Sequence, residues 1–386
     1  MLHRIDKKIC FYEKIKGKDS IIYNGEKYDT VNNDLITEIF KKPYNHEYIL
    51  VPYKGTDIET DYKQYIDDIE KIKLISDGKI NMYRTGTYSN TALCIFNSMN
   101  RIQAEKIENY EIPYLDNGGG TRYARPYQGK AYKYDICSYY PSVMDSKKLK
   151  IPIKKGTLTS MTTEEIYKTR ALKYGIYNVT IECDDKIKFT VQKSNMYSHI
   201  EVNYAKKLKL KIVSLGEHII FKQDDLVSCH SVFGEFVKYM FELKKKDKVF
   251  KNIISRLWGS LVQKNGGTVK QKMLYSELDT KKFDIIKMTP INKDMCEAFV
   301  RYPVLFYRNN FARLNAFLLG FTRVNMHKTF ELLGYDNIVF SHTDSIISTK
   351  RIEFNRIPFG DDIGKWKYEG VSNNCVVNNM NRYKFN

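Results

Sequence analysis

The chain has 386 residues, of which 42% are hydrophobic, so it is long enough for two or three domains with buried cores. Its 63 basic and 45 acidic side chains give a formal net charge of +18, which favours an anionic partner, nucleic acid first and an anionic membrane surface second. The seven cysteines form no CxxC pair, and no run of about 18 apolar residues occurs, which argues against a disulfide framework, a zinc site or a membrane span. Because no apolar stretch lies near the start, we expect an intracellular, reducing location.

Hydrophobic periodicity predicts a chain of mixed strands and helices. Alternating or apolar runs predict strands over 47–53, 131–136, 175–182, 337–340 and 345–349. Apolar residues at helical spacing predict helices over 61–76, 199–210, 232–246, 250–263 and 304–333. The glycine run Gly118–Gly120 interrupts this pattern and is the best candidate for a boundary before the main domain.

Two aspartates lie near the ends of predicted strands. Asp135 opens the segment DICSYYPS, residues 135–142, and Asp344 lies between two short apolar runs that predict a hairpin. If the strand ends lie side by side, the two carboxylates face one cleft, and like charges that close together need cations to neutralise them. Because Mg²⁺ prefers oxygen ligands, a two-metal site is one interpretation, and a helix-capping role for Asp135 is the other.

A lysine leads the predicted helix over 250–263. In the segment KNIISRLWG, residues 251–259, Lys251 lies opposite an apolar face, where it can bind an incoming triphosphate as a point charge. Gly259 allows a backbone or a base to approach closely. The alternative interpretation is a solvated lysine on an amphipathic helix. The apolar face consists of Ile253, Ile254, Leu257, Trp258 and Leu261.

In this order, the three segments resemble the three conserved motifs of family B DNA polymerases. Those motifs read DxxSLYPS, KxxxNSxYG and DTDS, where this chain has DICSYYPS, KNIISRLWG and HTDS. Gly118–Gly120 resembles a glycine element that touches the template strand in that family. Residues 363–369 (IGKWKYE) and 381–383 (NRY) resemble elements of its protein-primed branch, the second of which grips the primer terminus. The resemblance covers residues 110–386 and is looser over 60–100.

The resemblance implies template-directed addition of deoxynucleotides to a primer 3′ end by two-metal phosphoryl transfer. It implies two Mg²⁺ ions, with Mn²⁺ as an alternative, and as partners primer-template DNA, deoxynucleoside triphosphates, a terminal or priming protein, and a separate exonuclease or thumb polypeptide. The implied metal ligands are Asp135, Asp344 and Ile136, with both aspartates catalytic. The implied nucleotide-binding residues are Ser138, Tyr139, Tyr140, Lys244 and Lys251, with Tyr140 beneath the sugar and excluding a 2′-hydroxyl. The implied template and primer contacts are Gly118, Gly119, Gly120, Trp258, Gly259, Lys365, Lys367, Arg382 and Tyr383.

The fold class implied by the resemblance is α+β. It consists of a palm in which helices back an antiparallel sheet, short two-helix fingers and a small N-terminal domain. The expected boundaries are 1–115 for the N-terminal domain, 116–230 for the first part of the palm, 231–264 for the fingers and 265–386 for the second part of the palm.

Several residues depart from the family pattern. His342 replaces the first Asp of the third motif, which puts metal affinity in question, and Trp258 replaces the Tyr that packs near the nascent pair. Ser255 and Arg256 replace Asn-Ser, which puts nucleotide selectivity in question. These departures leave a second interpretation open, a catalytically weakened polymerase-like protein that binds nucleic acid as a replication or virion component. A basic structural protein of other ancestry is the third.

The tetrapeptide Asp57–Thr60 spells DIET, as in the first motif of a polymerase exonuclease. It follows Lys54-Gly55-Thr56 rather than an apolar strand, and fewer than 80 residues separate Asp57 from Asp135. An exonuclease needs more chain and further aspartates, so we expect no exonuclease activity.

Overall fold

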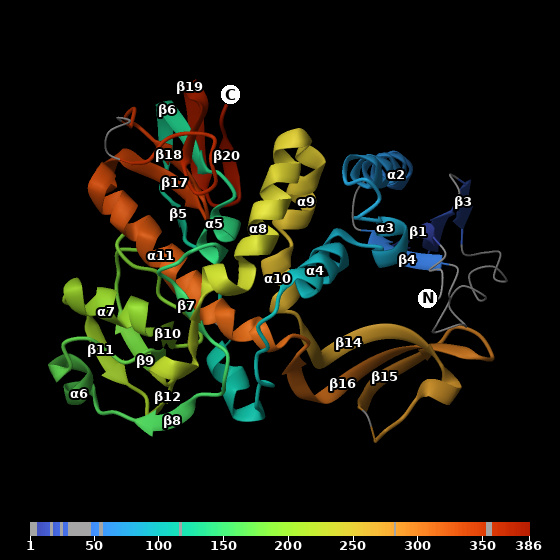
Figure 1. The fold of residues 1–386 in the computed structure, drawn as a ribbon, viewed down its shortest axis with the longest axis horizontal. Coiled ribbons are helices and arrows are strands. Elements are labelled where there is room, and N and C mark those ends of the chain that lie inside the picture. The colour runs from blue at the N-terminus through green and yellow to red at the C-terminus, as the bar shows by residue number, and fades with distance from the viewer. Residues whose placement is uncertain are drawn as a thin grey trace. The chain divides into compact units, whose positions relative to one another are not determined.

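The computed structural model divides the chain into two compact units. It describes residues 6–15, 18–23, 26–29, 48–53, 57–115, 118–281, 283–352 and 357–386. The first unit contains residues 1–99, 238–260 and 264–305, and the second contains 100–237, 261–263 and 306–386. Each unit is thus assembled from segments that are far apart in the sequence, as the colours in Figure 1 show.

A four-stranded sheet and the helix α2 form the first part of the first unit. The strand order is β3-β2-β1-β4, with β1 antiparallel to β2 and parallel to β4. Helix α2 packs on this sheet because its apolar stripe includes Tyr62 and Tyr65, whose rings lie 5.4 and 5.0 Å from the ring of Phe11. The elements are β1 (Lys8–Ile15), β2 (Lys18–Tyr23), β3 (Glu26–Asp29), β4 (Tyr48–Tyr53), α2 (Ile58–Ile75), α3 (Met82–Thr85) and α4 (Tyr88–Met99).

The second part of the first unit includes the C-terminal half of helix α8 (Cys229–Lys246) from residue 238 onward, and the segments that follow it. A three-stranded antiparallel sheet has the order β14-β16-β15, and one of its faces buries a small apolar cluster that includes Phe283, Cys296 and Val300. Sequence periodicity did not predict this sheet, since its other face carries exposed apolar side chains such as Phe299. The elements are η3 (Lys248–Phe250), α9 (Lys251–Ile254), α10 (Leu257–Leu261), β14 (Lys264–Leu274), η4 (Tyr275–Glu277), β15 (Asp284–Pro290) and β16 (Met295–Tyr307).

The single helix predicted over 250–263 is wrong, because the structure divides it into α9 and α10. At the break, the Ser255 hydroxyl donates to the Lys251 carbonyl at 2.6 Å, and the Arg256 amide bonds to the Ile253 carbonyl, three residues back instead of four. A serine that bonds to the preceding turn competes with the regular helical ladder. The apolar side chains predicted to share one face remain buried, except that Trp258 is half-buried.

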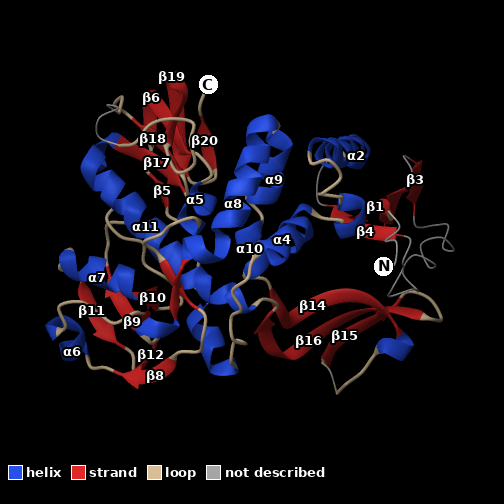
Figure 2. Cartoon of the chain, in the orientation of Figure 1, coloured by secondary structure: helices blue, strands red, loops and turns tan. Residues whose placement is uncertain are grey.

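A six-stranded antiparallel sheet dominates the second unit. Its order is β20-β19-β6-β18-β17-β5, so β6, which carries Asp135, lies in the middle, and the β17–β18 hairpin, which carries Asp344, lies beside it. Figure 2 shows this sheet in red near the C-terminus. Its strands are β5 (Arg122–Ala124), β6 (Tyr127–Ile136), β17 (Ile338–His342), β18 (Ser345–Ser348), β19 (Trp366–Asn379) and β20 (Arg382–Lys384).

A second layer of the same unit contains a smaller mixed region. Strands β8, β9, β10, β11 and β12 form one antiparallel sheet, β7 pairs with β13, and helix α7 packs on β9 and β10 around Tyr177, Tyr197 and Val202. The elements are η1 (Asn109–Leu115), α5 (Tyr139–Met144), β7 (Lys150–Pro152), β8 (Thr157–Ser160), α6 (Thr163–Lys168), β9 (Gly175–Glu182), β10 (Met196–Ser198), α7 (His199–Lys207), β11 (Lys211–Ser214), β12 (Glu217–Ile220), η2 (Gln223–Asp225), β13 (Leu226–Ser228) and α8 (Cys229–Lys246).

Helix α11 (Leu314–Leu333) runs through the second unit, preceded by η5 (Asn310–Arg313) and followed by η6 (Tyr335–Asn337). In Figure 1 it passes, in orange, between the six-stranded sheet and the sheet of β8–β12. It is buried on nearly all sides, and its buried residues include the polar Asn315, Arg323 and His327 as well as most of its apolar side chains. The helix predicted over 304–333 starts too early. The observed helix begins at Leu314, because residues up to Tyr307 belong to β16.

The remaining predicted elements are confirmed with shifted ends. The hairpin around His342–Asp344, the strand 175–182 and the helices near 61–76, 199–210 and 232–246 are all present. The chain is therefore a mixed α/β protein with a curled antiparallel sheet backed by helices. No helix in the described ranges is long and apolar enough to cross a membrane.

Candidate functional site

The two predicted metal ligands lie close together on the six-stranded sheet, Asp135 near the end of β6 and Asp344 in the turn between β17 and β18. Asp135 is directly opposite Ser345, and the amide of Ile136 donates to the carbonyl of Asp344 at 2.9 Å. Asp344 occupies a two-residue turn whose other residue, Thr343, adopts a left-handed conformation with φ of 60°. The tight turn thus holds Asp344 beside the end of β6, so the structure brings the two aspartates together.

The strand register extends this pairing into a row of five residues across the sheet. Lys367 on β19 is opposite Asp135, Asp135 is opposite Ser345, Ser345 is opposite His342, and His342 is opposite Arg122 on β5. Directly opposite residues of antiparallel strands share one face of the sheet. All five are exposed or half-buried, whereas the neighbouring row on the other face is mostly buried. Asp135 therefore shares this face with two cationic side chains, Lys367 on one side and Arg122 on the other.

Asp135 together with Asp344 in the adjoining turn suits a hard divalent cation. Two aspartates supply oxygen ligands, and Mg²⁺ typically takes one or two protein carboxylates and completes its shell with waters and substrate phosphates. No cluster of three or more His, Cys, Asp or Glu side chains with metal-binding geometry occurs among the residues that the structure describes. The residues present fit a metal that is bound together with a phosphorylated substrate better than a permanently held ion.

Tyr139 and Tyr140 follow directly in the short helix α5 and have different surroundings. The Tyr139 side chain is buried, and its hydroxyl donates to the carbonyl of Thr322 in α11 at 3.1 Å. Tyr140 lies beside Asp344 and the Thr343 side chain, and burial together with the negative charge of Asp344 raises its pKa to about 12. Tyr139 thus anchors α5 to α11, whereas Tyr140 faces the aspartate site.

The glycine run lies next to Tyr140. A Cβ on Gly120 would come within 2.9 Å of the Tyr140 hydroxyl and 3.1 Å of Thr343, whereas one on Gly119 would meet nothing within 4 Å. Gly118 has a φ of 61°, which favours glycine. The Thr343 amide donates to the carbonyl of Thr121 at 2.8 Å, so the turn that carries Asp344 is bonded to the segment that follows the glycines.

A buried ion pair that the sequence did not reveal supports this segment. Arg323 on α11 donates to the carbonyl of Gly119 at 2.7 Å and pairs with Glu201 on α7 at 2.8 Å, with both side chains nearly inaccessible. Glu201 also accepts bonds from the amide and hydroxyl of Ser198. One signal could have pointed to it: a charged residue inside an apolar-periodic helix needs a buried partner.

The other predicted residues of the second unit spread along the same sheet. Ser138 has a left-handed φ of 49° and starts α5, and the Lys365 carbonyl accepts from the Cys137 amide at 2.9 Å. The Lys365 ammonium pairs with Asp362 at 2.7 Å. On the edge strand β20, Arg382 and Tyr383 are exposed, and the Tyr383 ring lies 4.4 Å from the Phe340 ring.

Four predicted residues belong to the first unit. Lys244 lies in the basic last turn of α8, its ammonium 5.4 Å from the centre of the Phe241 ring, and Lys251 is exposed at the start of α9. Trp258 is half-buried in α10, and a Cβ on Gly259 would meet nothing within 4 Å, so that backbone is open to close approach.

The DIET segment has a structural explanation. Asp57 caps helix α2, accepting bonds from the amide and hydroxyl of Thr60, and Glu59 is exposed in the first turn. These bonds lower the pKa of Asp57, chiefly through the Thr60 hydroxyl. An aspartate at this position is a common helix cap. The expected absence of exonuclease activity stays a prediction.

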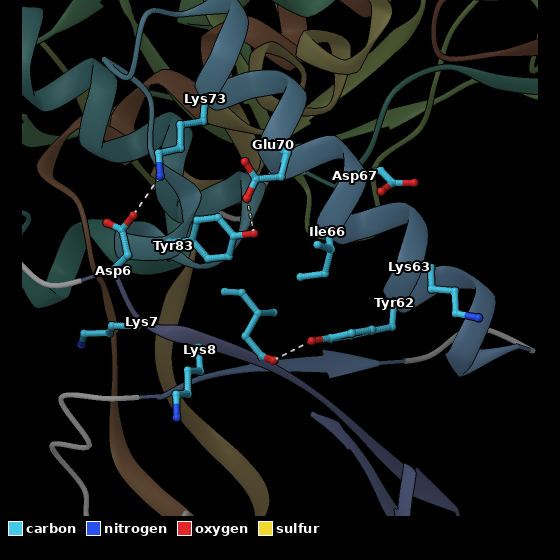
Figure 3. Close-up of a pocket in the computed structure, with 11 residues that line it drawn as sticks. Asp6, Lys7, Lys8, Tyr62, Lys63, Ile66, Asp67, Glu70, Lys73 and Tyr83 are labelled. Carbon is cyan, nitrogen blue, oxygen red and sulfur yellow. Dashed lines mark hydrogen bonds and ion pairs between the residues drawn. The ribbon is translucent and has the colours of Figure 1, made fainter. Parts of the chain in front are cut away.

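A cavity of about 630 Å³ lies in the first unit between β1, α2 and α3 (Figure 3). Its polar groups bond to one another: Asp6 accepts from Lys73 at 3.0 Å and from Asn81 at 2.8 Å, and the Tyr83 hydroxyl donates to Glu70 at 2.7 Å. These bonds tie the start of β1 to α2 and α3. The cavity contains none of the predicted site residues.

Comparison with known proteins places the fold. No family model matches the sequence, and no curated protein matches it. Solved structures of phi29 DNA polymerase do match. The complex with single-stranded DNA has a TM-score of 0.61 at 14% identity, covering 95% of this chain and 69% of that one. The ternary complex with primer-template DNA and incoming nucleotides has a TM-score of 0.60 at 15% identity, covering 95% of this chain and 70% of that one. The binary complex with primer-template DNA has a TM-score of 0.58 at 15% identity, covering 89% of this chain and 64% of that one.

This likeness establishes a fold resembling that of phi29 DNA polymerase over most of the chain. The chain spans about two thirds of the length of those polymerases.

Proposed function

We propose that the chain is a template-directed DNA polymerase core that adds deoxynucleotides to a primer 3′ end. The observation that carries this proposal is the adjacency of two motif aspartates from segments about 200 residues apart. Asp135 lies near the end of β6 and Asp344 in the turn next to it, beside Tyr140 and the glycine run. The fold likeness to phi29 DNA polymerase, in structures complexed with primer-template DNA and nucleotides, supports it independently.

In this proposal, the six-stranded sheet with α11 is the palm, and α8 to α10 are the fingers. Asp135, Asp344 and the main chain at Ile136 would hold two Mg²⁺ ions, or Mn²⁺, which activate the primer hydroxyl and stabilise the leaving pyrophosphate. Lys244 and Lys251 would supply positive charge to the triphosphate. Tyr140 would lie beneath the sugar and exclude a 2′-hydroxyl, and Gly118–Gly120 would let the template backbone approach closely.

The experiment that tests the proposal is extension of a labelled primer on a DNA template with deoxynucleotides and Mg²⁺ or Mn²⁺. Template-dependent extension by the wild-type chain, lost without a divalent cation, supports it. Tight DNA binding without any extension under either metal would favour a second function, a polymerase-like protein that binds nucleic acid without catalysis. The observation that favours this second function is His342, which stands in the third motif where the resembled family has an aspartate.

A further inference from the structure

We infer that Arg122 and His342 form a binding site for a backbone phosphate of the bound nucleic acid, beside the aspartate pair. The inference deepens the proposed function, because it takes nucleic acid as the partner and adds a contact that the sequence motifs do not contain. The proposed ligand is a phosphodiester group.

The two side chains form one hydrogen-bonded unit. The Arg122 guanidinium lies 3.1 Å from Nε2 of His342, on strands where the two residues are directly opposite. A guanidinium can only donate, so Nε2 of His342 is the acceptor of this bond, and Nδ1 lies 3.5 Å from the Thr343 hydroxyl. The pair therefore presents the further guanidinium N–H donors of Arg122 and its positive charge.

The Arg122–His342 pair lies where a ligand can reach it. Both side chains are exposed, and β5, the strand that carries Arg122, is the last strand in the order of the six-stranded sheet. An exposed contact of this kind adds little to stability. The pair shares a sheet face with Asp135, and neighbouring strands are separated by about 4.8 Å, so a ligand on it lies within two or three strand spacings of the carboxylate.

The glycine run provides a path to the pair. Gly119 leaves open space where a side chain would be, and Gly120 is followed after one residue by Arg122. A nucleic-acid strand lying close against the glycine backbone would therefore reach the guanidinium within a few residues' length, about 3.3–3.6 Å each. An arginine fork matches the geometry and charge of a phosphate.

Histidine at position 342 suits a phosphate-binding site. A carboxylate there, as in the motif that this segment resembles, would form an ion pair with Arg122 and neutralise its charge. The imidazole orients the guanidinium through this bond and adds no negative charge, so the charge of Arg122 can act on a phosphate. The substitution His342→Asp should therefore weaken nucleic-acid binding, even though it makes the motif more like that of the family.

The test measures binding of a labelled primer-template duplex and a labelled single strand by fluorescence anisotropy in EDTA, between about 50 and 200 mM salt. We expect Arg122→Gln to weaken binding about five-fold or more and to reduce the slope of log K against log salt by about one. His342→Asp should have a similar effect, and Arg122→Lys should retain the slope. The matched control is Arg170→Gln, an exposed arginine just after α6, which should bind within about two-fold of wild type.

Wild-type affinity and slope in both Arg122→Gln and His342→Asp, with unchanged thermal melting, would overturn the inference. Primer extension, measured separately, distinguishes this failure from failure of the proposed function. Extension-competent wild-type protein with unaffected variants contradicts only the phosphate site. Weakened binding in the two variants of a chain that cannot extend primers supports the site and contradicts only polymerisation.

Discussion

The hydroxyl of Tyr140 lies only 2.9 Å from where a Cβ on Gly120 would be, and the Thr343 side chain lies 3.1 Å from the same point. The glycine run, the first motif and the hairpin turn thus meet at one position without room for a methyl group. This contact links a residue proposed to face the sugar with one proposed to face the template. Adding one methyl group at Gly120 tests whether this close contact positions Tyr140.

Replacing Gly120 with alanine should displace Tyr140 or Thr343, because separations near 3 Å are shorter than ordinary carbon contacts. We expect Gly120→Ala to lower nucleotide incorporation about ten-fold or more, in line with the cost of small misplacements near a reacting centre. The comparison variant is Gly119→Ala, where the new methyl group meets nothing within 4 Å, so any loss there reports the proposed approach of the template and not a displacement of Tyr140. Equal activity of the two variants in primer extension would show that this contact does not position Tyr140.

The two tyrosines of the first motif should separate sugar choice from stability. Tyr140→Ala should increase ribonucleotide incorporation relative to deoxyribonucleotide incorporation, because a steric gate acts by exclusion. Tyr139→Ala removes a buried ring and its bond to Thr322, and should lower the free energy of unfolding by about 3–5 kcal/mol. The measurements are competition between the two nucleotide types and chemical unfolding. The opposite pattern would mean that Tyr139 faces the sugar.

The Arg323–Glu201 pair should be costly to break and cheaper to replace as a whole. Arg323→Met leaves a buried carboxylate without its partner and should destabilise the second unit by about 3–5 kcal/mol. The double variant Arg323→Met/Glu201→Leu should be less destabilised than Arg323→Met, because no unpaired charge remains. Urea unfolding of both variants measures the difference. Additive losses in the double variant would contradict the coupling.

Stability should fall between pH 6.5 and about 4 because of two buried histidines. Burial lowers the pKa of His199 and of His327 from 6.5 to about 4, so the unfolded chain binds protons in this range that the folded chain does not. Each imidazole contributes stability that is present above pH 6.5 and is lost as pH falls toward 4, on the order of 2–3 kcal/mol. His327→Gln, which can keep the bonds to Ile187 and Thr190, should flatten this pH dependence of unfolding. An unchanged pH profile in that variant would contradict the assignment for His327.

The sequence predicted local features well where a short segment carried its own signal. The hairpin around Asp344 was predictable because two apolar runs flank the polar residues His342, Thr343 and Asp344, and the strand leading to Asp135 alternates along its length. The Arg323–Glu201 pair could not be predicted from the sequence, because 122 residues separate its members and only tertiary packing brings them together. The break at Ser255 depends on one side-chain bond that periodicity does not register.

The row of residues from Lys367 to Arg122 could be predicted only in part. Each residue was visible in the sequence, but its meaning depends on register across five strands, and a shift of one residue would send a side chain to the other face. The sequence therefore predicted the presence of Asp135 and Asp344 near strand ends, and Lys367 as a nucleic-acid contact, but not that Lys367 and Arg122 share a sheet face with Asp135.

The most direct test of the central proposal is primer extension by Asp135→Ala and Asp344→Ala, with Asp184→Ala, an exposed aspartate after β9, as the control. We expect both site variants to lose nucleotide incorporation by about a thousand-fold or more, because each removes an oxygen ligand of the proposed metal site. Their melting temperature and DNA affinity in EDTA should stay close to wild type, and Asp184→Ala should remain active. Extension at a near wild-type rate by either site variant would contradict the assignment of that carboxylate and, with it, the proposed two-metal mechanism.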